Sequence, residues 1–62
     1  KNYITDGLVP NVVGMGAQDA LYLLESVGLK VQINGVGRVR QQSLRAGTKY
    51  YEGSTIVLTL RM

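Results

Sequence analysis

The sequence contains no cysteine and no histidine. The missing cysteine excludes a disulfide, and the absence of both residue types excludes a zinc site of the usual kind. It also removes the commonest general base and the strongest nucleophile of enzyme active sites. A chain of 62 residues ordinarily needs extra support of such a kind. We therefore expect no metal and no cofactor, and stability that rests on local geometry or on adjoining parts of a larger protein.

Long apolar runs and strong charge are missing as well. No stretch approaches the roughly 20 apolar residues that cross a bilayer, so we expect no membrane span within the chain. Residues 1–6 lack the apolar core of a signal peptide. Because the chain starts without methionine, we interpret it as a piece of a longer protein that would carry any anchor. The net charge of 7 − 4 = +3 favours anionic partners, but without a motif it does not predict nucleic-acid binding.

A catalytic set cannot be assembled from the remaining polar residues. None of the three serines has a lysine three residues later, which excludes a serine–lysine acylation centre. Of the four carboxylates, only Asp19 and Glu25 fall on one predicted element. Six residues apart on a helix, they are separated by about 600° and face different directions. We therefore predict that the chain is not an enzyme.

What is present is a change of hydrophobic period at Gly28. Before it, apolar residues recur at helical spacing, which predicts a helix over residues 16–27 with Leu24 in the middle of the buried stripe. Gly28 suits the left-handed residue that ends a helix. After it, apolar and polar residues alternate, and the chain is predicted to form strands over residues 29–33, 38–44 and 55–60.

This order of elements predicts an α+β domain with two layers. One α-helix packs on a three-stranded β-sheet and is preceded by a short extended N-terminal segment, in which Pro10 permits only an edge strand. Asn34-Gly35 is a strong hairpin signal, so residues 38–44 are predicted to return beside residues 29–33. We divide the chain into a linker, residues 1–8, and one domain, residues 9–62.

Two groups of residues are candidates for ligand contacts. Arg38 and Arg40 are two residues apart, so they project from one face of a strand, and Arg45 follows in the next turn. Guanidinium groups in this position could bind carboxylates or phosphates, while the alternative is a solvated strand face that discourages edge pairing. For the adjacent tyrosines we assign Tyr51 to the core and Tyr50 to the surface, where a ring beside arginine could meet sugars or partners.

Three stretches carry a pattern that covers residues 9–61. Residues 9–15 fit V-P-D/N-V-x-G-M, and residues 20–31 fit A-x-x-L-L-x-x-x-G-L-x-V. Residues 37–58 fit G-x-V-x-x-Q-S, then G-T, then G-S followed by an alternating strand. Together they resemble the PASTA domain, a module of bacterial penicillin-binding proteins and serine/threonine kinases. Leu44 and Ala46 stand where this family often has proline, and the connection between Ile33 and Gly37 is shorter than in many members.

The resemblance implies a non-catalytic accessory module on the outer, extracytoplasmic side of the plasma membrane. We favour the C-terminal part of a penicillin-binding protein transpeptidase as the parent. The implied partners are that transpeptidase domain and fragments of peptidoglycan, with weak recognition of stem peptides or β-lactams. The alternative is a scaffold that packs on and positions its transpeptidase, or a sensor domain of a serine/threonine kinase, without binding a ligand.

Overall fold

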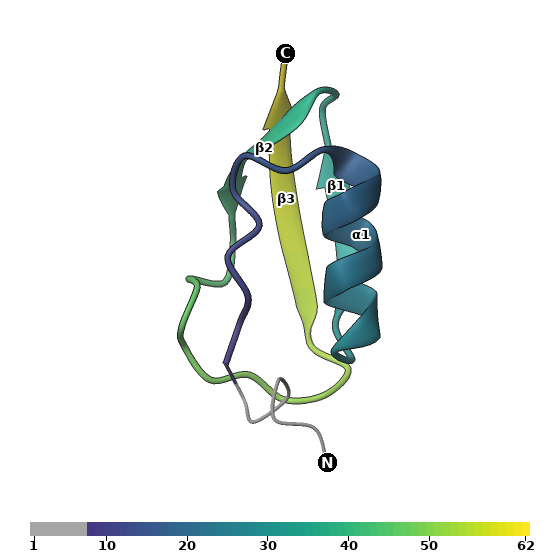
Figure 1. The fold of residues 1–62 in the computed structure, drawn as a ribbon. Helices are drawn as coiled ribbons and strands as arrows, with labels where there is room; N and C mark the ends of the chain where they lie inside the picture. The colour runs from purple at the N-terminus through teal and green to yellow at the C-terminus, as the bar shows by residue number, and fades with distance from the viewer. Residues whose placement is uncertain (1–7) are drawn as a thin grey trace.

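The computed structural model describes residues 8–62, so the predicted linker lies outside the described residues except for Leu8. Helix α1 (Ala17–Ser26) is followed by strands β1 (Lys30–Asn34), β2 (Arg38–Gln42) and β3 (Thr55–Arg61) (Figure 1). The predicted helix and all three strands are confirmed. The largest difference in their bounds is at the end of β2, where the chain bends after Gln42 instead of continuing to Leu44. Within residues 8–62, no helix is both long and apolar enough to cross a membrane.

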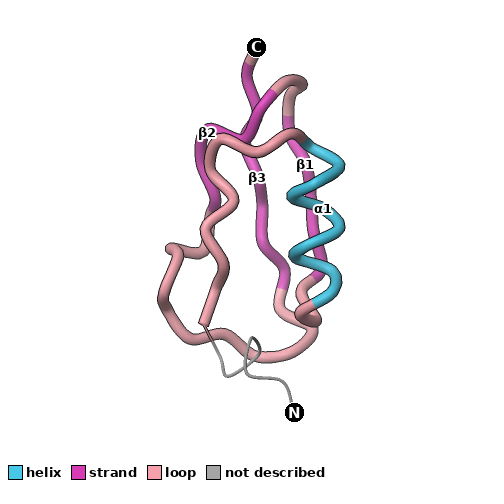
Figure 2. The backbone as a smooth tube through the Cα atoms, viewed as in Figure 1, coloured by secondary structure: helices cyan, strands magenta, loops and turns pink. Residues whose placement is uncertain are grey.

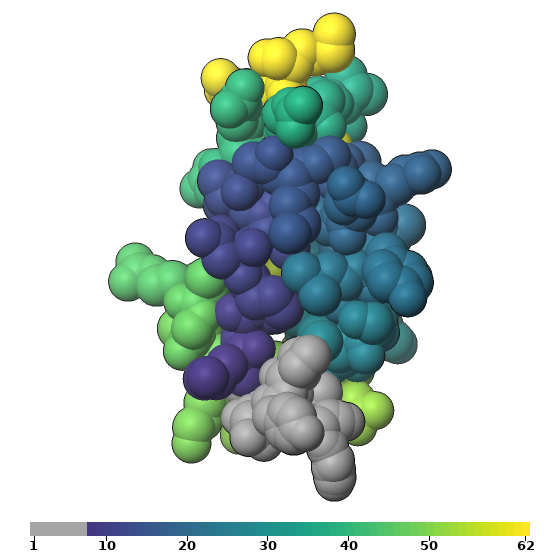
Figure 3. All heavy atoms as spheres, in the orientation of Figure 1, coloured from purple at the N-terminus to yellow at the C-terminus, as the bar shows by residue number. Residues whose placement is uncertain are grey.

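The molecule has two layers. The strands form one mixed sheet in the order β1-β3-β2, in which β1 runs parallel and β2 antiparallel to β3. Helix α1 and the segment that precedes it lie side by side on one face of this sheet (Figure 3). The predicted α+β architecture is therefore correct, and the segment before the helix contributes to the covering layer.

The predicted hairpin between the first two strands is wrong. Strand β3 lies between β1 and β2, and residues 35–37 carry the chain across the end of β3 (Figure 2). Gly35 and Gly37 adopt φ of 90° and 111°, and a Cβ atom at either position would overlap the carbonyl oxygen of Leu60 or Arg61. The glycines are therefore required by a close approach of two backbone segments. The Asn-Gly pair signals a turn correctly but does not reveal which strands become neighbours.

A hydrogen-bonded C-terminal cap ends α1 and directs the chain into β1. Gly28, with φ of 92°, donates from its backbone N–H to the carbonyl of Glu25 at 3.1 Å, and the N–H of Leu29 reaches the carbonyl of Leu24 at 3.1 Å. This pair of bonds is the Schellman arrangement. The next N–H, that of Lys30, donates to the carbonyl of Ser54 at 2.8 Å and begins the parallel pairing with β3.

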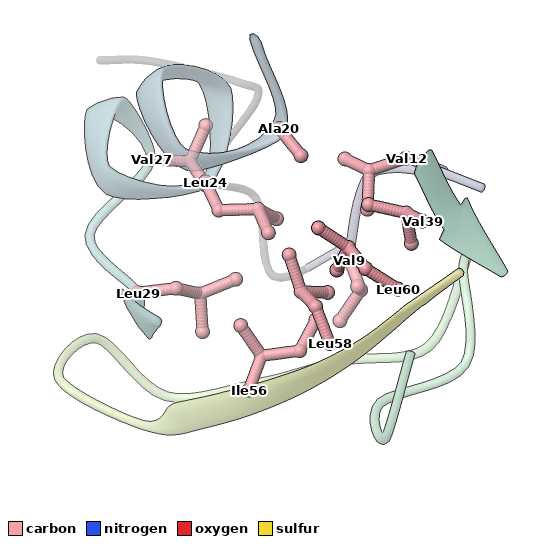
Figure 4. Close-up of a cluster of buried hydrophobic side chains, with 10 residues drawn as sticks. All are labelled: Val9, Val12, Ala20, Leu24, Val27, Leu29, Val39, Ile56, Leu58 and Leu60. Carbon is pink, nitrogen blue, oxygen red and sulfur yellow. The ribbon is translucent and has the colours of Figure 1, made fainter. Parts of the chain in front are cut away.

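A single apolar core lies between the two layers (Figure 4). Burial alternates along β3, as predicted, and Leu24 of α1 is fully buried. The predicted dry face of β1 weakens along the strand, since Val31 is half-buried and Ile33 is 37 % exposed. The core consists of Val9, Val12, Ala20, Leu24, Val27, Leu29, Val39, Ile56, Leu58 and Leu60.

The N-terminal segment pairs with the rest of the domain at two places. Val9 donates from its N–H to the carbonyl of Thr48 at 2.8 Å, although no strand forms there. Further on, the N–H of Gly14 donates to the carbonyl of Val39 at 2.8 Å, and the N–H of Val39 donates to the carbonyl of Met15 at 2.9 Å. No strand forms around Pro10, and the pairing of Gly14 and Met15 with Val39 covers the outer side of β2.

Candidate binding surface

Arg38 begins β2 and is held on both sides by backbone. It pairs in register with Arg61 of β3, and an isolated bridge joins it to Gly16 on its other side. Its side chain is exposed, and Nη1 donates to the carbonyl oxygen of Gly14 at 3.2 Å. This contact uses one of the five N–H donors of the guanidinium group. Arg38 is therefore positioned by the segment that leads into the helix.

Arg40 occupies an irregularity in β2. Val39 is in register with Leu60, and Gln41 with Thr59, so the residue between them has no partner on β3. Such a bulge bends the strand and changes the direction of the side chains around it. The prediction that Arg38 and Arg40 share one face relied on an unbroken alternation, which the structure interrupts. Both side chains are nevertheless exposed.

Arg45 lies in the loop that leaves β2. Its carbonyl oxygen accepts two hydrogen bonds from Thr48, one from the backbone N–H at 3.2 Å and one from Oγ1 at 2.6 Å. These bonds close a local turn while the arginine side chain remains exposed. The three predicted arginines therefore follow one another along β2 and the loop after it.

Tyr50 is placed differently from the prediction. Its ring is half-buried against the core, and its hydroxyl donates to the carbonyl oxygen of Val27 at 2.6 Å, whereas Tyr51 is 86 % exposed. The assignment of Tyr51 to the core and Tyr50 to the surface is wrong, because this segment is a loop without strand alternation. Burial and, to a smaller extent, the Glu52 carboxylate raise the pKa of the Tyr50 hydroxyl above its ordinary value of 10.0.

The structure also separates Tyr50 from Arg38. Arg38 bonds to Gly14, which precedes the helix, and Tyr50 bonds to Val27, which follows it. A helix of 10 residues is about 15 Å long. The two side chains are thus anchored at opposite ends of α1, and a single small ligand does not contact both anchoring points.

Charge is divided between the two layers. Within residues 8–62, two of the three carboxylates, Asp19 and Glu25, lie on α1, and the third is Glu52. The six basic side chains of the same range all lie on strands or loops. Residues 8–62 contain no cluster of three acidic side chains that could hold a metal ion. The sheet and its loops therefore form the positive side of the domain. The basic residues are Lys30, Arg38, Arg40, Arg45, Lys49 and Arg61.

Comparison with known families agrees with the fold and with the sequence pattern. The chain matches the family model of the PASTA domain over residues 7–61, nearly its whole length. It belongs to the PASTA domain family. No match was found among curated proteins. PASTA domains are accessory modules associated with penicillin-binding proteins and serine/threonine kinases, and they have no catalytic role themselves.

In this PASTA domain the Gln-Ser pair at the end of β2 has a structural role that the sequence did not reveal. The side-chain oxygen of Gln42 accepts from the N–H of Val12 at 3.0 Å, and its nitrogen donates to the carbonyls of Pro10 and Leu44 at 3.1 and 2.8 Å. The glutamine thereby ties the N-terminal segment to β2. Its place in the family pattern was the available signal, but spacing alone did not show which backbone groups it would meet.

Ser43 extends the pairing of β2 with β3 by one residue. Its N–H donates to the carbonyl of Val57 at 2.9 Å, and its hydroxyl oxygen accepts from the N–H of Val57 at 2.8 Å. The side chain thus replaces a backbone acceptor where the strand bends away. These two bonds fix the backbone between Arg40 and Arg45 against β3.

Proposed function

We propose that this PASTA domain is an extracytoplasmic accessory module of a peptidoglycan-synthesising penicillin-binding protein, and that it weakly recognises peptidoglycan stem peptides. Membership of the family supports the accessory role. The observation that carries the proposed recognition is the succession of Arg38, Arg40 and Arg45, all exposed, on the positive side of the domain. Tyr50, the fourth predicted contact, lies at the opposite end of α1 from Arg38, so the arginines are proposed to bind the ligand without it.

The chemistry of the stem peptide suits these arginines. Stem peptides carry carboxylates, and the planar guanidinium group binds a carboxylate with two parallel hydrogen bonds. Because all three side chains are exposed, each ion pair contributes only about 0–1 kcal/mol. Three such contacts contribute at most about 3 kcal/mol together, so we expect a Kd of several millimolar or weaker, since 1 mM corresponds to about 4 kcal/mol. Screening of exposed charges predicts that the affinity falls as salt is added.

An NMR titration with a soluble muropeptide, repeated with a soluble β-lactam, tests the proposal at low and high salt. We expect amide and guanidinium shifts at Arg38, Arg40 and Arg45 that shrink at high salt. The double variant Arg38→Gln/Arg40→Gln should weaken binding by up to about fivefold for each arginine removed. Lys49→Gln removes one exposed charge from the same side and is the matched control, for which we expect little change. If Lys49→Gln weakens muropeptide binding as much as the loss of an arginine does, the binding depends on general electrostatic attraction and not on these arginines.

A scaffold function is the second candidate, and two exposed aromatic side chains favour it. Tyr22 on α1 is 78 % exposed and Tyr51 is 86 % exposed, and aromatic residues are enriched where proteins meet. In this alternative the domain packs on its own transpeptidase and positions it. Absence of any shift at millimolar muropeptide, together with shifts at Tyr22 and Tyr51 when the transpeptidase domain is added, would favour the scaffold.

A further inference from the structure

The two edges of the sheet differ in how they are covered. On the outer side of β2, the chain itself supplies a partner, because Gly14 and Met15 exchange hydrogen bonds with Val39. Strand β1 forms the opposite edge. Within residues 8–62, β1 pairs only with β3, so its other side has no backbone partner there. Among the described residues, one edge of the sheet is therefore closed and the other is open.

The backbone groups at the open edge can be identified from the pairing with β3. The N–H of Lys30 donates inward to the carbonyl of Ser54. In a strand, the N–H and C=O groups of one residue point to the same side, and successive residues alternate. Val31 and Ile33 therefore direct their N–H and C=O groups outward. They present two donors and two acceptors in the spacing that another strand requires.

Strand β1 lacks three of the features that protect open edges, namely a proline, a bulge and a charge in the middle of the strand. Natural edges are blunted by proline, by a bulge or by a charge in the middle of the strand. The central residues of β1 are Val31, Gln32 and Ile33, its register with β3 is unbroken, and its one charge is at its first residue, Lys30. Ile33, on the face that carries the core, is 37 % exposed. The edge thus combines unpaired backbone with accessible apolar surface.

The charges around this edge select the kind of segment that fits it. Lys30 lies at one end of β1. At the other end, the turn of residues 35–37 passes directly over the backbone of Arg61. Neither β1 nor β3 contains an acidic residue, although the side chain of Glu52 lies beside Gly28, two residues before Lys30. An added strand therefore gains most from acidic side chains near the Arg61 end, and from apolar side chains beside Val31 and Ile33.

We propose that the outer edge of β1 binds an extended, acidic segment of a partner protein as a fourth strand, through backbone hydrogen bonds to Val31 and Ile33. This mode of recognition takes affinity from the main chain and selectivity from alternate side chains. It is separate from the recognition of stem peptides by the arginines of β2, because β3 lies between the two strands. The domain then has two binding surfaces, one for cell-wall fragments and one for protein.

Amide hydrogen exchange of the whole chain tests this proposal directly. The probe is a synthetic peptide of alternating valine and threonine with two glutamates at each end. Free peptide at ten times its Kd should slow exchange of the Val31 and Ile33 amides about tenfold, because only the bound state protects them. The amides of Lys30 and Gln32, which face β3, should change much less. Uniform protection along β1, or none at all, would overturn the proposal.

A pair of variants separates edge pairing from general attraction. Ile33→Lys places an inward-facing charge on the edge, a device that natural proteins use against strand addition, and should abolish protection by the peptide. Val36→Lys makes a similar change at a side chain that is 67 % exposed in the turn outside the strand, and should leave protection intact. A peptide of the same sequence with lysine in place of glutamate should bind at least several-fold more weakly. Loss of protection in both variants, or equal binding of both peptides, would contradict the proposal.

Discussion

Leu24 occupies the middle of α1 and is fully buried among the apolar side chains of the core (Figure 4). Truncating such a residue removes its burial and leaves a cavity. We predict that Leu24→Ala lowers the free energy of unfolding by about 2–5 kcal/mol, a large part of the total in so small a domain. Urea unfolding measures the change. Tyr22→Ala, on the exposed side of the same helix, is the control, and an equal loss in both variants would show that packing is not the cause.

Tyr50 gives the stability a dependence on alkaline pH. Burial raises the pKa of its hydroxyl in the folded state, so the unfolded chain loses this proton at a lower pH than the folded chain. The stabilisation is fully present below about pH 10 and is lost as the pH rises through the folded-state pKa. We predict that the urea midpoint falls as the pH rises above about 10, and that Tyr50→Phe reduces this fall.

The comparison for this prediction is Tyr51→Phe. Tyr51 is 86 % exposed, so removing its hydroxyl should leave the pH dependence unchanged. If both phenylalanine variants lose stability alike at alkaline pH, other titrating groups cause the loss, and the raised pKa of Tyr50 does not account for it.

Among the elements, the turn between β1 and β2 tolerates side chains least, because its glycines touch the backbone of β3. A Cβ atom at Gly37 would overlap the carbonyl of Arg61, whereas one at Gly47, which also has positive φ, would meet nothing within 4 Å. We predict that Gly47→Ala costs about 1–2 kcal/mol for its left-handed backbone and that Gly37→Ala costs more. Unfolding midpoints of the two variants test this. Equal costs would mean that the turn does not press against β3 as the structure indicates.

The elements themselves were predictable because each carries a local signal. Helical spacing up to Val27, the stop at Gly28 and the alternation of Ile56, Leu58 and Leu60 depend only on nearby residues. The strand order was not predictable, because the Asn34-Gly35 signal fits both a hairpin and a crossing over β3. Only the non-local contact of the turn with Leu60 and Arg61 decides between them.

The candidate surface was predictable to a lesser extent. Exposure of the three arginines follows from their charge, but the bulge at Arg40 depends on how β2 registers with β3. The burial of Tyr50 depends on a loop that returns beneath the end of the helix to meet Val27. Neither feature has a signature within the residues concerned, since both are set by contacts distant in sequence.

At the scale of the whole molecule, membership of the PASTA family makes the domain an accessory module without a catalytic role. The chain has no cysteine or histidine, and no serine is paired with a lysine in the required spacing. We predict that a fluorescent penicillin does not label the purified chain covalently. The measurement is fluorescence of the denatured protein on a gel, with an active transpeptidase as the positive control. A labelled band that survives denaturation would show that the chain contains a reactive nucleophile.

The proposed recognition depends on the carboxylate of the stem peptide, which the arginines of this domain are expected to bind. Two muropeptides that differ only in having the terminal carboxylate free or amidated are titrated in parallel, and chemical shifts are followed by NMR. We predict that the free carboxylate shifts Arg38, Arg40 and Arg45 with millimolar affinity, and that the amidated ligand binds several-fold more weakly. Equal binding of the two ligands, or no shifts with either at millimolar concentration, would contradict recognition of the stem carboxylate by these arginines.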